Sequence, residues 1–347
     1  MENLREGELL GMGNPLLDMV CSVSLELLAK YGLEKNSAVL ADPEKHTALF
    51  EELQARDDVE SIPGGAVLNT LRGVQWVLGK RNVASYFGAV GKDAFGSLLL
   101  QKAREAGVDA RCQLVDDVKT GTCAVLVNGE NRSLCTDLAA ANCFTEEHVK
   151  ANWETVERAS VVYVSGFFFT VSPASILRIA RHVCETNKRL ALNLSADFIM
   201  KVPPFWKSLQ EALPYADVIF GNETEAEAFS EAMGWGSALP LDDIGRRMQA
   251  LPKANGKRQR LVVLTQGARP VVVVGDGGLV REFPVDEVPA AELVDTNGAG
   301  DAFVGGFLPQ YLQGKELAEC VRYASNAAGV MIRRSGCSYP SNCHFAS

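Results

Sequence analysis

The residues of this chain best suited to chemistry lie in one short stretch, residues 295–303, which reads DTNGAGDAF. Its three small residues, Gly298, Ala299 and Gly300, precede an apolar helical pattern, so we expect a helix to begin at about Gly298. A helix start presents unpaired backbone N–H groups and roughly half a positive charge, and glycine lets a phosphate approach closely. Asp301 would lie in the first turn, where a carboxylate can take a proton from an attacking hydroxyl. The stretch predicts phosphoryl transfer with Asp301 as the base, although a lone Asp here would only suit a helix start.

Other common phosphate-binding and kinase patterns are absent from the sequence. It contains no G-x-x-x-x-G-K-[ST] loop and no H-R-D catalytic triplet, and Gly64-Gly65 is not part of a G-x-G-x-x-G fingerprint. None of the nine cysteines forms a C-x-x-C pair, and only four histidines accompany them. We therefore expect reduced thiols in a cytoplasmic protein rather than a zinc site or a disulfide framework.

Composition narrows the class of partner. The chain has 347 residues, 47% of them apolar and 22% charged, which suits a large folded lobe with a smaller one. A net charge of −9 argues against nucleic acid or a membrane surface as the partner. The most apolar run, residues 161–171, is far shorter than the ~20 residues that span a bilayer. The one dense basic stretch, residues 253–260, is interpreted as a solvated approach to the strand that follows it.

Short apolar runs alternate with helical patterns along most of the chain. Because these strands are apolar throughout, they predict a parallel sheet covered by helices on both faces, an α/β fold. The expected strands are 9–12, 84–89, 161–164, 189–194, 218–220 and 261–265, and the expected helices include 71–78, 95–106, 175–186 and 223–233.

Two excursions interrupt this alternation. Runs at 123–127 and 133–135 flank Asn128-Gly129, a strong hairpin signal, and a strand-like piece occurs at 38–40. They predict a small antiparallel sheet, whereas a second hairpin, 271–274 with a turn at 276–278, belongs to the main lobe. The expected domains are a large one, residues 1–16, 64–116 and 142–347, and a small lid, residues 17–63 and 117–141.

The motifs resemble a known family. Residues 295–301 resemble the C-terminal signature of the ribokinase (PfkB) family of carbohydrate and nucleoside kinases, and Gly64-Gly65-x-x-x-Asn69 resembles its N-terminal motif. Further stretches resemble the branch of that family that phosphorylates adenosine. They run from residue 11 to residue 337 and read GMGNPLLD (11–18), NRSL (131–134), LAAAN (138–142), GFF (166–168), NLS (193–195), GNETEA (221–226), TQG (265–267) and IRRSGC (332–337).

The resemblance implies a nucleoside site. The family uses the positions of Asn14, Asp18, Gly64, Gly65 and Asn69 to bind a ribose. A helix cap is the alternative interpretation of Asp18. The family lines its base pocket at Leu16, Leu40, Cys123, Leu138 and Phe168, with Phe168 suited to stacking, although ordinary core packing would explain all five. Ala66 and Leu68 depart from the serine and glutamine expected for the adenosine branch, which leaves fine selectivity open.

The resemblance also implies an ATP site. In the family, the N-x-x-E element, here Asn222 and Glu225, organises Mg²⁺ near the nucleotide phosphates; a helix start rich in acids is the alternative. Arg132 would neutralise the transferred phosphoryl group, although it could be a surface arginine. Some members bind a monovalent cation beside the Asp-Thr pair, which makes K⁺ a candidate activator. Further ATP contacts are expected from Thr265, Gly267, Asn297 and Asn326.

The expected activity is Mg·ATP-dependent phosphorylation of a nucleoside 5′-hydroxyl in purine salvage, with adenosine as the first candidate substrate. The small lid would exclude water, and the resemblance implies a monomer. Two alternatives stay open: a kinase of the same family for another nucleoside or a sugar, and a non-catalytic nucleoside-binding protein.

Overall fold

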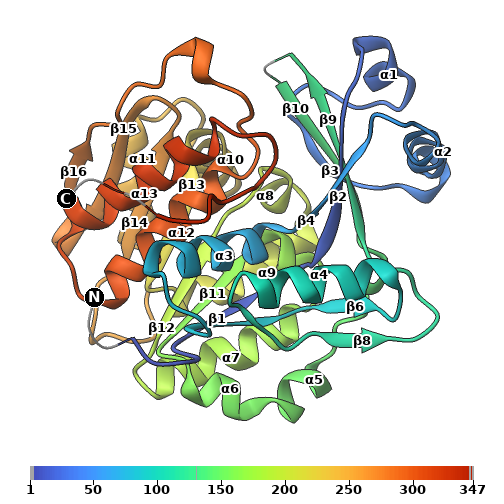
Figure 1. Cartoon of the computed structure of the whole chain (residues 1–347). Helices are drawn as coiled ribbons and strands as arrows, with labels where there is room; N and C mark the ends of the chain where they lie inside the picture. The colour runs from blue at the N-terminus through green and yellow to red at the C-terminus, as the bar shows by residue number, and fades with distance from the viewer. Residues whose placement is uncertain (1–3, 130, 344, 346–347) are drawn as a thin grey trace.

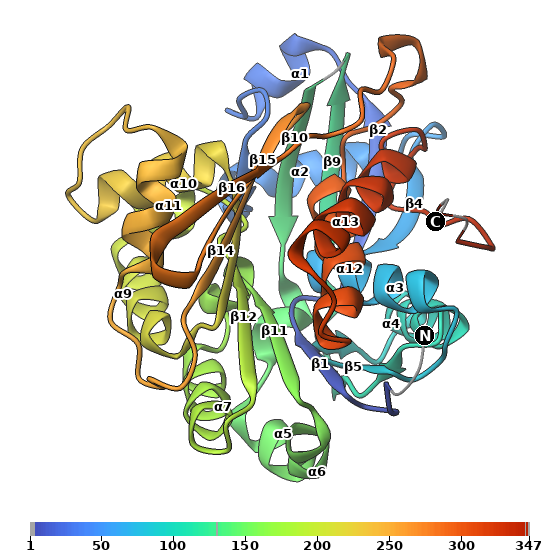
Figure 2. The same cartoon turned by 90° about the vertical axis from the view of Figure 1, so that its left-hand side faces the viewer.

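The alternation of strands and helices builds one large twisted sheet (Figures 1 and 2). The computed structural model describes residues 4–129, 131–343 and 345. Within them the sheet has nine strands, in the spatial order β16 (Leu279–Phe283), β15 (Arg269–Gly275), β14 (Leu261–Gln266), β13 (Val218–Asn222), β12 (Arg189–Asn193), β11 (Val161–Ser165), β1 (Leu9–Met12), β5 (Ala84–Phe87) and β7 (Asp109–Ala110). Neighbouring strands from β14 to β7 are parallel, and β15 and β16 add an antiparallel hairpin at the other edge.

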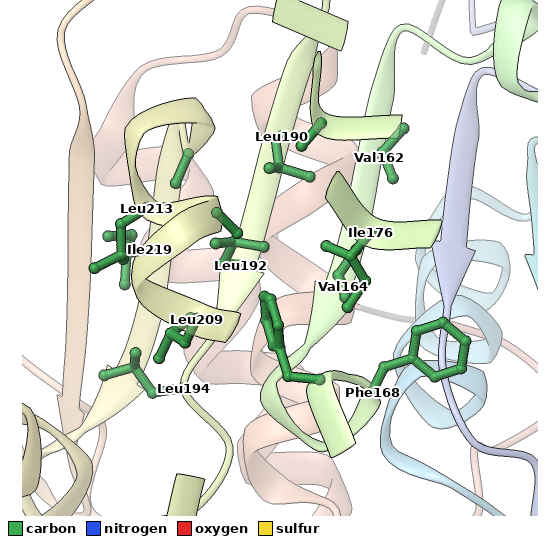
Figure 3. Packing of buried hydrophobic residues seen from close by; sticks show 14 of the residues in the cluster. Val162, Val164, Phe168, Ile176, Leu190, Leu192, Leu194, Leu209, Leu213 and Ile219 are labelled. Atoms are coloured by element: carbon green, nitrogen blue, oxygen red, sulfur yellow. The ribbon is translucent and has the colours of Figure 1, made fainter. Parts of the chain in front are cut away.

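Helices cover both faces of this sheet, as expected for strands that are apolar throughout. The side chains of Val162, Leu192 and Ile219 point to one face, where they pack with Ile176 and Leu209 of the covering helices (Figure 3). That face carries α5 (Glu146–Ala151), α6 (Trp153–Arg158), α7 (Pro173–Glu185), α9 (Pro203–Ala212), α10 (Glu223–Ala232) and α11 (Leu241–Gln249). The other face carries α3 (Ala66–Leu78), α4 (Ala94–Glu105), α12 (Ala299–Leu312) and α13 (Leu317–Met331).

A second sheet, here called the small sheet, stands over one end of the large one (Figure 1). Its order is β3 (Ala38–Leu40), β10 (Asn131–Asp137), β9 (Thr122–Asn128), β2 (Leu16–Ser22) and β4 (Glu60–Gly64). Helices α1 (Leu25–Lys30) and α2 (Pro43–Gln54) pack on it around a separate core that includes Leu28, Leu49 and Leu126. The prediction of an antiparallel sheet is wrong in part, because β2 pairs with β9 and β10 with β3 in parallel. Parallel pairing follows because the strands of each pair come from different excursions.

The main strands and helices fall where the sequence predicts them, within a few residues at their ends. The largest difference is α3, which begins at Ala66 directly after Gly65, five residues before the predicted start at 71. The predicted strand at 84–89 divides into β5 and the short β6 (Ala89–Gly91), which pairs with β8 (Gln113–Val115) in a two-stranded sheet. In the part of the chain that the structure describes, no helix has the length and apolarity needed to cross a membrane.

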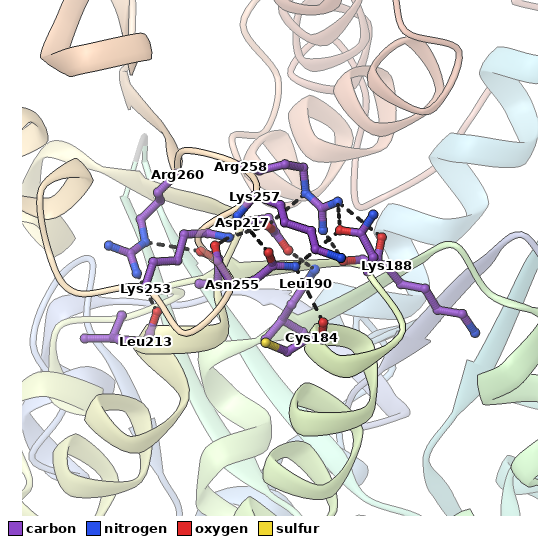
Figure 4. Close-up of polar contacts among 12 residues, drawn as sticks. Cys184, Lys188, Leu190, Leu213, Asp217, Lys253, Asn255, Lys257, Arg258 and Arg260 are labelled. Carbon is purple, nitrogen blue, oxygen red and sulfur yellow. Dashed lines mark hydrogen bonds and ion pairs between the residues drawn. The ribbon is translucent and has the colours of Figure 1, made fainter.

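The amino ends of β13 and β14 carry a polar cluster, here called the amino-end cluster, in which Asp217 and Arg260 are buried and Lys253 and Arg258 are partly buried (Figure 4). The Asp217 carboxylate binds Lys253 Nζ at 2.6 Å and Arg258 Nε at 3.3 Å, and accepts the Leu190 amide at 2.9 Å. The interpretation of residues 253–260 as solvated is therefore wrong for these three basic residues. The Asp217 carboxylate and the carbonyls at the nearby helix ends attract them into the fold.

Arg260 is the most buried member of that cluster, with 1% of its surface exposed. Its guanidinium donates to five carbonyl oxygens, those of Leu213, Ala216, Met248, Leu251 and Pro252, at 2.6 to 3.2 Å. Burial lowers the Arg260 pKa to about 10. Three of these carbonyls, at Leu213, Met248 and Leu251, lie at or just beyond the ends of α9 and α11, where helices leave acceptors unpaired.

Candidate active site

A cavity of about 210 Å³ lies where the carboxyl ends of the large-sheet strands face the small sheet. Carboxyl ends of parallel strands are where α/β sheets bind ligands. Twelve residues singled out from the sequence line the cavity: Asn14, Leu16, Asp18, Leu40, Gly65, Asn69, Cys123, Leu138, Asn297, Gly298, Gly300 and Asp301. They come from segments almost 300 residues apart, so the fold brings the N-terminal and C-terminal motifs to one site.

Asp301 lies in the first turn of α12, as predicted, with Gly298 at the N-cap and a φ of 75° that suits glycine. Asn69 Nδ2 donates to Asp301 Oδ2 at 3.1 Å, which fixes the carboxylate across the cavity from α3. Burial raises the Asp301 pKa from 3.8 to about 7. A carboxylate with a pKa near neutral is suited to accept a proton at physiological pH.

The first turn of α12 also provides a place for an anion. The Ala299 amide already donates to the Thr296 carbonyl at 3.2 Å and the Asn297 amide to Asp295 Oδ1 at 2.8 Å. The amide of Gly300 has no backbone partner among the described residues, as is usual in a first helical turn. A Cβ at Gly300 would meet no atom within 4 Å, so the missing side chain leaves open space beside the helix start. This turn, residues 298–300, is here called the cradle.

Asp18 and Asn14 form a second polar group on the same cavity. Asp18 is 8% exposed, and its pKa is raised from 3.8 to about 7 by burial, and further by Asp301, against the opposing charge of Arg72. Gly64 packs directly on the Asp18 carboxylate, so any side chain there would collide with it. Asn14 Oδ1 is buried without a hydrogen-bond partner among the described residues. A buried acceptor of this kind is costly unless a ligand donates to it.

The other end of the cavity is apolar. Leu16, Leu40, Cys123 and Leu138 line it as predicted, together with Val125 and Leu134 of the small sheet. Phe168, predicted to stack on a base, lies instead in the large core with 0% exposed surface (Figure 3), its ring centroid 5.2 Å from that of Phe144. Its neighbour Phe167 lines the cavity. Both lie in the tight turn Gly166–Thr170, whose successive side chains point in different directions, a detail that the Gly-Phe-Phe motif does not specify.

Arg132 does not line the cavity but connects the small sheet to the cradle loop. Its Nε binds Asp295 Oδ1 at 2.8 Å and its Nη2 donates to the Val294 carbonyl at 3.2 Å. The Asp295 carboxylate also accepts the amides of Asn297 at 2.8 Å and Gly336 at 3.0 Å. Arg132 is thus a largely buried residue paired with Asp295, which lies two positions before Asn297. Both oxygens of Asp295 already accept hydrogen bonds.

Asn222 and Glu225 form a helix cap at the start of α10. Asn222 Oδ1 accepts the Glu225 amide at 2.9 Å, and the Glu225 carboxylate accepts the Asn222 amide at 3.0 Å and its Nδ2 at 2.9 Å. Burial raises the Glu225 pKa to about 7. Among the described residues, no group of three or more His, Cys, Asp or Glu side chains could hold a metal ion.

The remaining predicted nucleotide contacts lie outside the cavity. Thr265 is the penultimate residue of β14, beside β13, and its Oγ1 donates to the Gly221 carbonyl at 3.4 Å. Gly267 follows with a φ of 63°, and Asn326 is half-buried on α13.

Several cavity residues were not predicted from the sequence. They include Thr136, Ser165, Phe167, Ser195 and Phe198. Arg72, whose charge lowers the Asp18 pKa, lies one helical turn after Asn69, and its Nη1 lies 3.4 Å from Asn69 Oδ1. The spacing of Asn69 and Arg72 on one helix could have indicated this residue. Phe167 and Ser195 lie in the GFF and NLS stretches, which could have indicated them, whereas Thr136, Ser165 and Phe198 lie outside the motifs.

Comparison with known proteins identifies the family. The chain matches the description "pfkB family carbohydrate kinase" over residues 26–343 and belongs to that family. It is 47% identical to adenosine kinase 1 of Arabidopsis thaliana over 343 residues, 98% of each chain. It is 42% identical to the adenosine kinase of Saccharomyces cerevisiae over 336 residues, 95% of this chain and 96% of the relative.

Solved structures give the same result. The adenosine kinase of Anopheles gambiae, solved with P1,P4-di(adenosine-5) tetraphosphate, superimposes with a TM-score of 0.94 at 46% identity, covering 98% of this chain and 100% of the other. The adenosine kinase of Schistosoma mansoni, solved with adenosine and AMP, superimposes with a TM-score of 0.90 at 36% identity, covering 97% and 98%. The ribokinase-like fold and the family expected from the motifs are both confirmed.

Proposed function

We propose that this chain is an adenosine kinase, which transfers the γ-phosphoryl group of ATP to the 5′-hydroxyl of adenosine and releases AMP and ADP. The observation that carries the proposal is the position of Asp301: it lies in the first turn of α12, beside the cradle, on the same cavity as Asn14 and Asp18. The full-length similarity to adenosine kinases supports the choice of nucleoside.

Asp301 accepts the proton of the 5′-hydroxyl as that oxygen attacks the γ-phosphorus. Asn69 donates to one carboxylate oxygen at 3.1 Å, which orients the other toward the hydroxyl. The low polarity that raises the Asp301 pKa makes its carboxylate a stronger base than one in water. The Gly300 amide, which has no backbone partner among the described residues, stabilises the charge that develops on the transferred phosphoryl oxygens, since the helix start favours negative charge.

Asn14 and Asp18 bind the ribose hydroxyls. Asn14 Oδ1 offers an acceptor that has no partner among the described residues, and Asp18 offers a carboxylate with no hydrogen-bond donor among them. Vicinal hydroxyls would supply the missing donors to both. The apolar half of the cavity, with Leu16, Leu40 and Leu138, then receives the base.

Mg²⁺ supplies positive charge that neutralises the ATP phosphates when it is bound. Asn222 and Glu225 carry oxygens of the type that Mg²⁺ prefers, and a buried Glu225 with a raised pKa would gain from a nearby cation. Because these oxygens already accept hydrogen bonds within the cap, we assign them to the ion through its waters. The Asp295 carboxylate already accepts from Arg132, Asn297 and Gly336, which uses three of its roughly four lone-pair sites, and we assign no step to K⁺.

The small domain, residues 17–63 and 117–141, contains most of the small sheet and acts as a lid. It covers the large domain, residues 1–16, 64–116 and 142–347. Arg132 joins the two through its ion pair with Asp295, and brings a positive charge to the loop that leads into the cradle. Exclusion of water by the lid would limit the wasteful hydrolysis of ATP. The enzyme is proposed to be a cytoplasmic monomer in purine salvage, consistent with nine free cysteines.

An ADP-formation assay across adenosine, guanosine, inosine, ribose and 5′-deoxyadenosine tests the function. Adenosine should give the highest kcat/KM, and 5′-deoxyadenosine should give no product because it lacks the attacking hydroxyl. Faster turnover of ribose or of another nucleoside would assign a different substrate in the same family. Binding of adenosine without ADP formation in the presence of Mg·ATP would support a non-catalytic binding protein.

A further inference from the structure

The chain passes between the large lobe and the small sheet four times. One of these crossings is bound by the carboxylate of Asp93, a residue that none of the motifs above includes. The second excursion leaves the large lobe at residues 118–121, between β8 and β9. Asp93, the N-cap of α4, lies against this crossing and contributes nothing to the cavity. Helix α4 itself contacts β2 and β4 of the small sheet (Figure 1).

Asp93 binds the crossing at Thr120 with both of its oxygens. Oδ2 accepts the Thr120 amide at 2.7 Å, and Oδ1 accepts the Thr120 hydroxyl at 2.6 Å and the Gly96 amide at 2.7 Å. Thr120, which is 0% exposed, accepts the Gly91 amide on the same hydroxyl at 3.1 Å. This group, Asp93 and Thr120 with their partner amides, is here called the clasp.

The segment around the clasp is shaped to the crossing. A Cβ at Gly91 would collide with the Val118 carbonyl, and a Cβ at Gly96 would lie 2.9 Å from Thr120 Oγ1. Both glycines therefore let the backbone of the large lobe reach the crossing more closely than another residue would allow. The clasp fixes the crossing to a rigid helix start on one side and to β6 on the other.

The crossing then determines where two walls of the cavity lie. Gly121 follows Thr120, and a Cβ there would lie 2.6 Å from the Leu138 carbonyl and 2.8 Å from Leu16 Cδ2. The Leu17 amide donates to the Gly121 carbonyl at 2.9 Å. Leu16 and Leu138 both line the cavity, so one residue separates the clasp from the apolar end of the site.

We propose that Asp93 is a positioning residue for the reaction: by clasping Thr120 it holds the lid crossing, and with it Leu16 and Leu138, in register with Asp301. The proposal rests on the proposed function for its kinetic readout. A looser crossing lowers the fraction of enzyme molecules that have a complete cavity. The apparent affinity for the nucleoside falls in proportion to that fraction. Water also reaches the ATP phosphates more often, so ADP forms without AMP.

Asp93→Asn and Thr120→Val test it. Asn presents an amide donor where the crossing offers donors, and Val keeps the shape of Thr without its hydroxyl. We expect each to raise the adenosine KM about tenfold, to lower kcat by less than about threefold, and to raise the ratio of ADP to AMP above one. Thr120→Ser, which keeps the hydroxyl, should restore the KM and the coupling.

Asp116→Asn is the matched control. Asp116 lies in the same connection, its side chain is 71% exposed, and it pairs only with Lys92 at 2.7 Å among the contacts in the described chain. Its kinetics should be those of the wild type. If Asp93→Asn does not fold, Thr120→Val decides alone.

Folded variants with wild-type KM and wild-type coupling would overturn the proposal. A lower Tm without any kinetic change would also overturn it, because that result would show a purely structural role. If the wild type makes no AMP from adenosine, the proposed function fails by itself. Limited proteolysis then tests whether the clasp holds the crossing. Asp93→Asn should be cut within the small sheet faster than Asp116→Asn, and equal cleavage rates would reject the positioning role of Asp93.

Discussion

The two ends of the large sheet both bury charged residues, but they treat them in opposite ways. At the amino ends, Asp217 has two cationic partners and a backbone donor, and Arg260 has five carbonyl acceptors. At the carboxyl ends, Asp18 and Asp301 share one cavity, and burial raises the pKa of each to about 7. The first end has satisfied its charges internally, whereas the second leaves them incomplete.

The comparison separates structural from functional burial. A buried charge with a full set of partners adds nothing for a ligand to complete, because its hydrogen bonds are already made. A buried carboxylate or amide without partners costs stability in the free protein, and a ligand that supplies the donors recovers that cost. Perturbed groups of the second kind gather at functional sites.

The largest effect is expected at the amino end. Asp217→Asn leaves the largely buried Lys253 and the partly buried Arg258 without their carboxylate and should lower the free energy of unfolding by about 3 kcal/mol, the low end for a broken buried pair. Measured by denaturant unfolding, the loss should come with an unchanged kcat per folded molecule. The control is Asp242→Asn, which removes an exposed helix pair with Arg246 and should cost under about 0.5 kcal/mol. An Asp217→Asn protein as stable as this control would remove the distinction between the two ends.

Asp301→Asn should have the next largest effect, and on rate rather than stability. Loss of the base should lower kcat by at least ~10²-fold, about 2.7 kcal/mol of activation free energy, with little change in adenosine affinity. Asp18→Ala should instead raise the adenosine KM, because its contacts to the ribose exist before the reaction. Steady-state kinetics on folded variants distinguish the two. Near-normal kcat in Asp301→Asn with no turnover in Asp18→Ala would reverse the roles.

The smallest effect is a gain in stability at the carboxyl end. The folded pKa of Asp18 and Asp301 is about 7 against 3.8 for an ordinary Asp, so the folded state binds their protons more tightly. Their destabilisation is absent below about pH 4, grows as pH rises, and is complete above about pH 7.

Asp18→Asn, which removes one of these charges, should raise Tm at pH 8 by roughly 2–4 °C. The gain should vanish at pH 4, as followed by thermal unfolding at the two pH values. A lower Tm at pH 8 would show that the carboxylate is satisfied in the free protein.

The sequence predicts the large sheet well because its strands are uniformly apolar and the helices between them periodic. It also indicates Asp301, Asn69 and Asp18, all three of which line the cavity. Asp301 is indicated by the residue types of its own motif, whereas Asn69 and Asp18 are indicated by the family resemblance. It does not predict that Phe167 rather than Phe168 lines the cavity. A tight turn sets side-chain direction through dihedral angles that the motif leaves open. Nor does it predict the burial of Arg260, whose five acceptors come from two helix ends and a loop brought together only in the fold.

The pairing of β2 with β9 has a consequence for how the chain folds. Leu17 pairs with Thr122, so a loop of more than a hundred residues must close when these strands meet. Closing so long a loop costs entropy, and contacts of high sequence separation form slowly. Most of the intervening chain belongs to the large lobe, so the small sheet should complete late in folding and open first under mild denaturant. Amide hydrogen exchange should therefore show β2 and β9 less protected than β11 and β12, and activity should disappear while most of the molecule is still native.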